Sequence, residues 1–189
     1  MIANSARFLM RAVHLALLLL LLAPVLASAK DPVTLDAIRA KVRQDYPGVQ
    51  QLSTKALAER IARGAPVVLL DVREKQEFAV SRIRGAQRVD PGIWRSTFMN
   101  RFGDKLRGKT VVFYCSVGVR SSRLAASVQA ALKERGVGEV YNLDGGVFAW
   151  HNEMRPLENG QGATDFVHPY DKYWGKLVDR RALVSTTPK

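Results

Sequence analysis

The sequence predicts an α/β fold built on a parallel sheet, because apolar runs of strand length alternate with segments of helical periodicity. Residues 67–72 (VVLLDV) and 110–114 (TVVFY) are the clearest of these runs, and their near-continuous apolar content indicates strands that are buried on both faces. The only cysteine, Cys115, directly follows the second run, and helical spacing begins just after it. Ligands of parallel sheets bind beyond the carboxyl ends of the strands, so this cysteine lies where a site is expected.

The remaining elements follow from periodicity and from capping or breaking residues, taken in chain order. Helical segments are predicted at residues 33–46, 53–64, 74–80 and 90–109, the last with Trp94, Phe98 and Phe102 as buried aromatics. Two shorter segments, residues 87–89 and 139–143, have the apolar content of strands. A helix running from the cysteine loop to Gly136, and another after Asp144-Gly145-Gly146, complete the series.

The start of the chain has the order of a secretory signal. In residues 1–29, Arg7 and Arg11 precede an apolar core, and small residues end the segment. We therefore expect cleavage after Ala29 and a periplasmic protein, which would meet a membrane only transiently through its signal peptide. An uncleaved membrane anchor is the alternative.

The end of the chain also departs from the pattern of its middle. From Pro156 onwards the chain is rich in Gly and Asn, which predicts a linker, and several aromatic residues follow it (Phe166, Tyr170, Tyr173, Trp174). A free tail would not carry so many aromatics, so we expect it to pack on the domain or on a protein partner. The predicted organisation is a signal peptide (1–29), a leading helix (30–49), one domain (50–155), and a linker with an aromatic C-terminal tail (156–189).

Basic residues are concentrated around the cysteine. The chain carries 29 Lys and Arg against 17 Asp and Glu, and residues 81–123 contain ten basic residues against two acidic ones, a net charge of +8. This field favours a small anionic substrate or an acidic partner, although a solvated basic surface would have the same composition. No nucleic acid is expected as a partner, because neither a recognition motif nor interleaved aromatic and basic residues are found.

The cysteine loop, Cys115 to Ser122 (CSVGVRSS), has the features of an anion-binding nucleophile loop. Ser116 and Gly118 are small enough for a tight turn in which successive backbone N–H groups point inward, and the following helix adds its positive end. A thiolate would be stabilised there, and the thiolate is the reactive form of cysteine. A small buried apolar side chain is the alternative interpretation of Cys115.

Four stretches together resemble the rhodanese family of sulfurtransferases, in the family's order and spacing. They are LLDVREKQEF (residues 69–78), SRIRGAQRV (81–89), VVFYCSVGVRSS (111–122) and NLDGGVFAW (142–150). The resemblance covers about residues 50–155. Two positions depart from it: Ser81-Arg82 replaces the usual Gly-His, and Ser116 stands where well-known thiosulfate-using members have an arginine.

The resemblance implies a rhodanese-like three-layer fold, with a five-stranded parallel sheet flanked by helices. It also implies that Cys115 forms a persulfide and that Asp71 and Arg73 support the domain structurally. The loop that would surround the transferred sulfur consists of Ser116, Val117, Gly118, Val119 and Arg120.

The implied reaction moves a sulfane sulfur from a donor to a thiophilic acceptor through the cysteine. The donor would be thiosulfate or a persulfide or polysulfide, and the acceptor cyanide or a thiol; the serine at position 116 argues against thiosulfate as the preferred donor. We expect neither a metal nor an organic cofactor, since the three histidines are scattered.

Two other functions share parts of this pattern. A phosphatase or arsenate reductase loop has five residues between its cysteine and arginine, whereas four separate Cys115 from Arg120. A non-catalytic rhodanese-like module that binds sulfur or a partner would use the same fold, but such modules often lack the cysteine.

Overall fold

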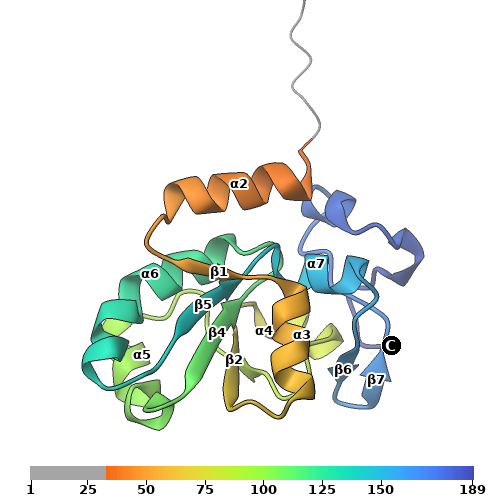
Figure 1. The fold of residues 1–189 in the computed structure, drawn as a ribbon. Coiled ribbons are helices and arrows are strands. Elements are labelled where there is room, and N and C mark those ends of the chain that lie inside the picture. Colours follow the sequence, from red (N-terminus) through yellow and green to blue (C-terminus); the bar gives the residue numbers. More distant parts are fainter. Residues whose placement is uncertain (1–32) are drawn as a thin grey trace, which may run out of the picture. The chain divides into compact units, whose positions relative to one another are not determined.

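A five-stranded parallel sheet forms the centre of the molecule in a computed structural model, which describes residues 33–189. The predicted signal peptide therefore lies outside the described residues. The strand order is β1-β5-β4-β2-β3 (Figure 1). The strands are β1 (Gln50–Leu52), β2 (Val67–Asp71), β3 (Gln87–Arg88), β4 (Thr110–Tyr114) and β5 (Val140–Leu143). This arrangement confirms the predicted α/β fold class.

Helices cover both faces of the sheet and enclose two separate apolar cores. One core contains residues of α2 (Leu35–Asp45), α3 (Thr54–Ala62) and α7 (Gly146–Asn152). The other contains residues of α5 (Arg95–Phe102) and α6 (Val119–Glu134). The short helix α4 (Lys75–Val80) follows β2. The sheet is thus the middle layer of three.

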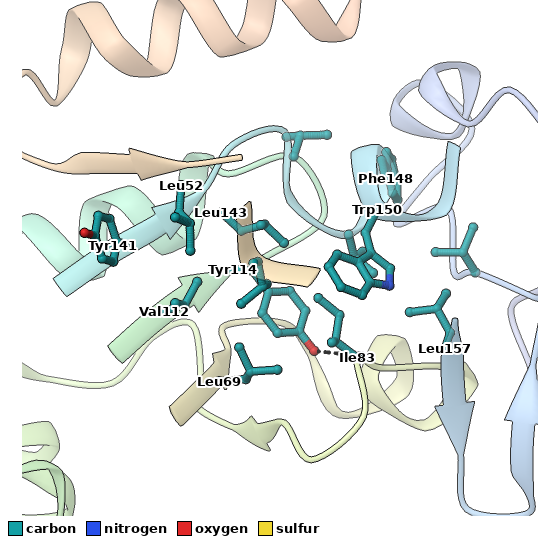
Figure 2. Close-up of a cluster of buried hydrophobic side chains, with 14 of the residues drawn as sticks. Leu52, Leu69, Ile83, Val112, Tyr114, Tyr141, Leu143, Phe148, Trp150 and Leu157 are labelled. Atoms are coloured by element: carbon teal, nitrogen blue, oxygen red, sulfur yellow. Dashed lines mark hydrogen bonds between the residues drawn. The ribbon is translucent and has the colours of Figure 1, made fainter. Parts of the chain in front are cut away.

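Strand β4 is largely apolar because both of its faces are buried. Val112 and Tyr114 point into the first core, whereas Val111 and Phe113 belong to the second. All four are fully buried, because side chains of a strand alternate between the faces and both faces are covered here. Tyr114 also brings its hydroxyl into the first core, where it accepts a hydrogen bond from the Ile83 amide at 3.2 Å (Figure 2). The central strand is therefore fixed on both sides up to the residue before Cys115.

The structure adds one strand to those expected and differs from one expected burial. The polar triplet QQL has no strand pattern, yet it forms β1, because residues Gln50 to Leu52 pair in parallel register with Tyr141 to Leu143 of β5. Trp94 was expected to be a buried aromatic, but it is 81% exposed as the N-cap residue of α5, while Phe98 and Phe102 are buried. Only the side chains on the inward face of this helix reach the core.

The segment after Pro156 is a hairpin, and the predicted linker is wrong at this point. Strands β6 (Leu157–Asn159) and β7 (Gly162–Thr164) pair in antiparallel register, so the Gly and Asn content belongs to a tight turn. Beyond the hairpin are two short 3₁₀ helices, η3 (Trp174–Leu177) and η4 (Arg181–Leu183).

The C-terminal residues pack on the domain. Four of them enter the first core as buried side chains: Leu157, Val167, Leu177 and Val178. Within residues 33–189, no helix combines the length and the apolar character that crossing a membrane requires.

Candidate active site

Cys115 lies directly after β4, at the carboxyl edge of the sheet. Its side chain is only 1% exposed, and its Sγ accepts a hydrogen bond from the Gly118 amide at 3.2 Å. Strand β4 pairs with β2 on one side and β5 on the other, so the cysteine follows the central strand of the sheet. The Gly118 N–H is thus directed at the sulfur.

Gly118 gives the loop its turn and marks the start of α6. Its φ of +97° lies in the left-handed region, and a Cβ on it would lie 3.0 Å from the side-chain nitrogen Nδ2 of Asn142. Glycine is the residue that adopts this conformation without steric cost. Its carbonyl then accepts a bond from the Ser122 amide within the first turn of the helix.

The N-terminus of α7 holds the cysteine loop from behind. The amides of Val147 and Phe148 donate to the carbonyls of Cys115 and Ser116 at 2.9 and 3.0 Å. Gly146 makes this approach possible, because a Cβ on it would lie only 2.4 Å from the Cys115 carbonyl oxygen. Glycine at position 146, the first residue of α7, is therefore required by the contact with the loop.

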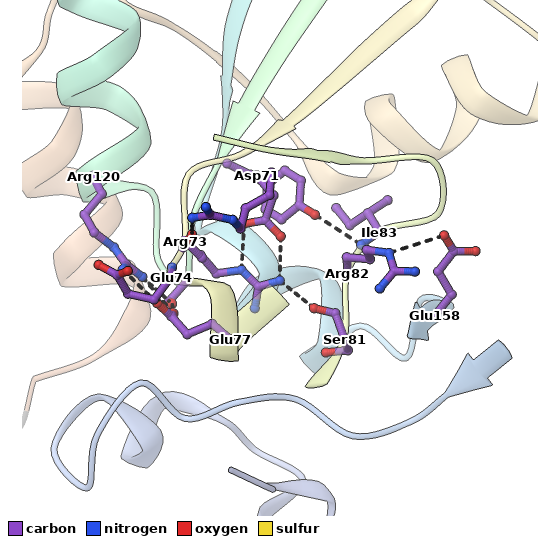
Figure 3. A network of polar contacts seen from close by, with 12 residues as sticks. Asp71, Arg73, Glu74, Glu77, Ser81, Arg82, Ile83, Arg120 and Glu158 are labelled. Carbon is purple, nitrogen blue, oxygen red and sulfur yellow. Dashed lines mark hydrogen bonds and ion pairs between the residues drawn. The ribbon is translucent and has the colours of Figure 1, made fainter. Parts of the chain in front are cut away.

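Arg120 is bound edge-on by a buried carboxylate. Its Nη1 and Nη2 each donate to Glu77 of α4 at 2.8 Å, and Nη2 also donates to the Ser116 hydroxyl at 3.0 Å (Figure 3). Ser116 in turn donates to Glu77 at 2.8 Å. Glu77 is fully buried, so this bidentate pair is held in a region of reduced solvent screening.

The charges of this network stabilise one another. Burial alone would raise the pKa of Glu77, but the hydrogen bonds from Arg120 hold that pKa below its usual value. Burial alone would lower the pKa of Arg120, but its bond to Glu77 and the nearby Cys115 sulfur raise it above the ordinary value. Arg120 therefore stays charged beside the cysteine, with most of its charge balanced by Glu77.

Asp71 and Arg73 form a second buried ion pair at the end of β2. Arg73 Nε and Nη2 donate to the two Asp71 oxygens at 2.8 and 2.6 Å, and Nη2 also reaches the Ser81 carbonyl at 2.6 Å (Figure 3). Both side chains are fully buried. They join the strand end to the segment after α4, and this geometry favours a structural role.

Ser81-Arg82, which replaces the Gly-His of the motif, lies where the C-terminal hairpin packs on the domain. Arg82 exchanges two backbone hydrogen bonds with Glu158 of β6, at 2.8 and 2.9 Å. Its side chain also donates to the Asn159 carbonyl at 3.1 Å. The arginine that replaces the usual histidine thus serves the attachment of a segment beyond the motif-bearing domain.

The C-terminal tail reaches the cysteine loop through Tyr170. The Tyr170 ring lies over the Arg120 guanidinium, with 4.7 Å between the ring centroid and Cζ. His168, two residues earlier, is 4% exposed.

Of the predicted loop residues, Gly118 donates its amide to the Cys115 sulfur and Ser116 is bound to Arg120. The loop residues differ in exposure. Ser116 and Val117 are buried, whereas Val119 is 39% exposed. Sequence reasoning missed Glu77 and Tyr170 as members of the site. Glu77 could have been suspected as the acidic residue of the first motif, but no local signal connects Tyr170 to the loop.

The basic surface around the site is partly neutralised. Five of the ten basic residues in 81–123 form ion pairs: Arg82, Arg84, Arg88, Arg107 and Arg120. Among the described residues, no cluster of three or more His, Cys, Asp or Glu side chains could hold a metal ion.

Residues 53–153 match the rhodanese-like domain family, which confirms the resemblance. A tRNA uridine(34) hydroxylase from Bordetella petrii is 35% identical over 131 residues, covering 61% of this chain and 50% of that protein. A sulfurtransferase from Allochromatium vinosum is 29% identical over 114 residues, covering 60% of this chain and 99% of that protein. A thiosulfate sulfurtransferase structure from Pseudomonas aeruginosa aligns with a TM-score of 0.51 at 21% identity, covering 68% of this chain and 23% of that one.

These similarities support different conclusions about the chain. The chain spans about half of the Bordetella hydroxylase, whose name describes the longer protein. The structural likeness shows the fold. The family match ends at residue 153, so the hairpin and the tail that carries Tyr170 lie beyond it.

Proposed function

Because the chain belongs to the rhodanese-like domain family, we propose that it moves a sulfane sulfur from a donor to a thiophilic acceptor through a persulfide on Cys115. The single observation that carries this proposal is the position of the sulfur. It lies at a strand end, 3.2 Å from the Gly118 amide and beside the Arg120 cation. Both groups stabilise a thiolate, which is the nucleophile that this chemistry needs.

In the first step the Cys115 thiolate attacks the outer sulfur of the donor. A new S–S bond forms, the donor's own bond to that sulfur breaks, and the rest of the donor leaves with the bonding electron pair. With thiosulfate the leaving group would be sulfite, and with a polysulfide the shortened polysulfide. The negative charge moves outward by one sulfur and remains near the loop amides and the positive end of α6.

In the second step a cyanide or thiolate acceptor attacks the terminal sulfur of the persulfide. The acceptor–sulfur bond forms as the S–S bond to Cys115 breaks, and the cysteine returns to its thiolate. The two steps balance without an oxidant or reductant, because the sulfane sulfur is passed on unchanged in oxidation state.

Ser116 bears on the choice of donor. Its hydroxyl is hydrogen-bonded to Glu77 and Arg120. Unlike an arginine at this position, a serine adds no positive charge to the site. A dianion such as thiosulfate therefore meets one guanidinium whose charge is largely balanced. We infer that an organic persulfide, whose far end need not carry a charge, is a better donor than thiosulfate.

The test is the mass of the protein after exposure to each donor. Incubation of the reduced protein with thiosulfate or inorganic polysulfide, followed by intact-mass measurement, should show one added sulfur atom that cyanide removes as thiocyanate. Cys115→Ser is the matched control: it changes one buried atom, so the fold should persist while the sulfur uptake disappears.

The alternative is a non-catalytic module that uses the same fold to bind sulfur compounds or a partner. It predicts that the wild-type protein gains no covalent sulfur with either donor. Sulfur uptake by the serine variant at the wild-type rate would equally rule out the mechanism.

A further inference from the structure

The Tyr170 ring and Glu77 hold the Arg120 guanidinium from two sides. Glu77 and Ser116 bind its edge, while the ring covers its face with its centroid 4.7 Å from Cζ. This separation is within the range of an attractive cation–π contact. The guanidinium is thus oriented by an element of the domain and by an element that lies beyond the family match.

Tyr170 has an unusual backbone conformation, which a local hydrogen bond accompanies. Its φ is +66°, in the left-handed region that side-chain-bearing residues rarely adopt. Its amide donates to His168 Nδ1 at 3.0 Å, which closes a local turn. Strained backbone of this kind persists only where the surroundings impose it, and it is concentrated at functional sites.

The chain on the N-terminal side of Tyr170 is fixed to the domain. Val167 is fully buried in the first core, and it also forms a parallel bridge with Val184 of the same tail. His168 is 4% exposed, and burial lowers its pKa despite the nearby Glu77 carboxylate. A neutral imidazole can accept the Tyr170 amide proton at Nδ1, so the turn is maintained near neutral pH.

We propose that Tyr170 is a positioning residue of the sulfur-transfer site: its ring holds the Arg120 guanidinium in the orientation that favours an anion at Cys115. Through Tyr170, a residue beyond the family match is therefore part of the active site. This inference rests on the proposed function, but its first readout below does not require sulfur transfer.

The variants separate the ring from the backbone. Tyr170→Gly removes the ring and suits the left-handed conformation, so the tail should stay docked. Tyr170→Phe keeps the ring and removes only the hydroxyl. Tyr173→Ala is the matched control, because Tyr173 is an aromatic of the same tail, 52% exposed and packed on Trp174 instead.

The first readout is the rate of Cys115 alkylation by anionic iodoacetate divided by its rate with neutral iodoacetamide. This ratio reports the local positive field at the sulfur and cancels changes in nucleophilicity. Loss of one cation–π contact should lower the ratio about 3- to 10-fold in Tyr170→Gly. Tyr170→Phe and Tyr173→Ala should stay within about twofold of wild type.

The second readout is the steady-state kinetics of sulfur transfer from thiosulfate. Tyr170→Gly should raise the KM for this anionic donor about 3- to 10-fold, with a smaller change in kcat. Wild-type values for Tyr170→Gly in both readouts, or a Tyr170→Phe variant as impaired as Tyr170→Gly, would overturn the inference. If Tyr170→Gly fails to fold, Tyr170→Asn tests the same point, because asparagine also tolerates this backbone.

The two proposals can fail separately. If the wild-type protein takes up no sulfur, the proposed function is wrong, while the alkylation ratios still decide whether Tyr170 positions Arg120.

Discussion

At the scale of single residues, Glu77 determines how Arg120 can act. The carboxylate is fully buried and accepts both terminal nitrogens of the guanidinium. Arg120→Ala would leave this charge buried without its cation, and breaking such a pair costs about 3 kcal/mol or more. We therefore expect the variant to lose about 3 kcal/mol of unfolding free energy in urea, along with sulfur transfer.

Arg123→Ala is the control, since Arg123 is exposed on the same helix and should change stability by less than about 0.5 kcal/mol. A second check is Glu77→Gln: added to Arg120→Ala, it removes the stranded charge and should cost less than the sum of the two changes. Equal losses in Arg120→Ala and Arg123→Ala would contradict the buried-pair account.

The sequence identified the residues that share one contiguous loop. Cys115 and Arg120 were found because a strand, a tight turn and a helix follow one another there. Glu77 lies 43 residues from Arg120, so its role depends on how α4 and α6 pack. Ser116 was recognised as a departure, but its bond to Glu77 could not be inferred from the chain alone.

At the scale of elements, the fit between α7 and the cysteine loop is the sharpest constraint. Gly146 has a φ of +61°, and a Cβ there would lie 2.4 Å from the Cys115 carbonyl oxygen and 2.7 Å from that of Ser116. Gly146→Ala should displace the loop and reduce sulfur transfer at least about tenfold, with a stability loss of about 1–3 kcal/mol.

Gly160→Ala is the matched control, because its added methyl group would meet nothing within 4 Å and no left-handed φ is involved. Activity and melting temperature should both stay at the wild-type level in that variant. Wild-type sulfur transfer by Gly146→Ala would show that the loop tolerates a displaced α7.

Elements were predictable where their own sequence decides their structure. β2 and β4 are apolar because both of their faces are covered, and α6 has a full apolar stripe. β1 is polar and exists only through its pairing with β5. The hairpin β6–β7 was mistaken for a linker because Gly and Asn occur in tight turns and in linkers alike.

At the scale of the whole molecule, the order of charged, apolar and small residues in 1–29 predicts export and processing. We propose that the exported protein begins at Lys30. N-terminal sequencing of protein recovered from a periplasmic extract should give that residue. Protein that keeps Met1 and sediments with membranes would instead support an uncleaved anchor.

The stability of the fold should depend on pH through two buried histidines, His151 of α7 and His168 of the C-terminal tail. Burial lowers the pKa of both His151 and His168 below the ordinary 6.5. Their folded forms bind protons less readily than the unfolded chain, so stability is full above about pH 6.5 and falls as the pH drops below it. The lowered pKa of Glu77 adds a further loss below about pH 4.5, as the pH passes through its folded value.

Urea unfolding between about pH 7 and pH 5 should therefore show declining stability, by at most about 1.4 kcal/mol per pH unit for each linked proton. His168→Asn removes one titrating group while Oδ1 can still accept the Tyr170 amide in place of Nδ1. Its stability should fall less steeply with acid than that of the wild type. A variant with the wild-type slope would mean that His168 is not among the groups that resist protonation, and that the turn carrying Tyr170 onto Arg120 is insensitive to pH.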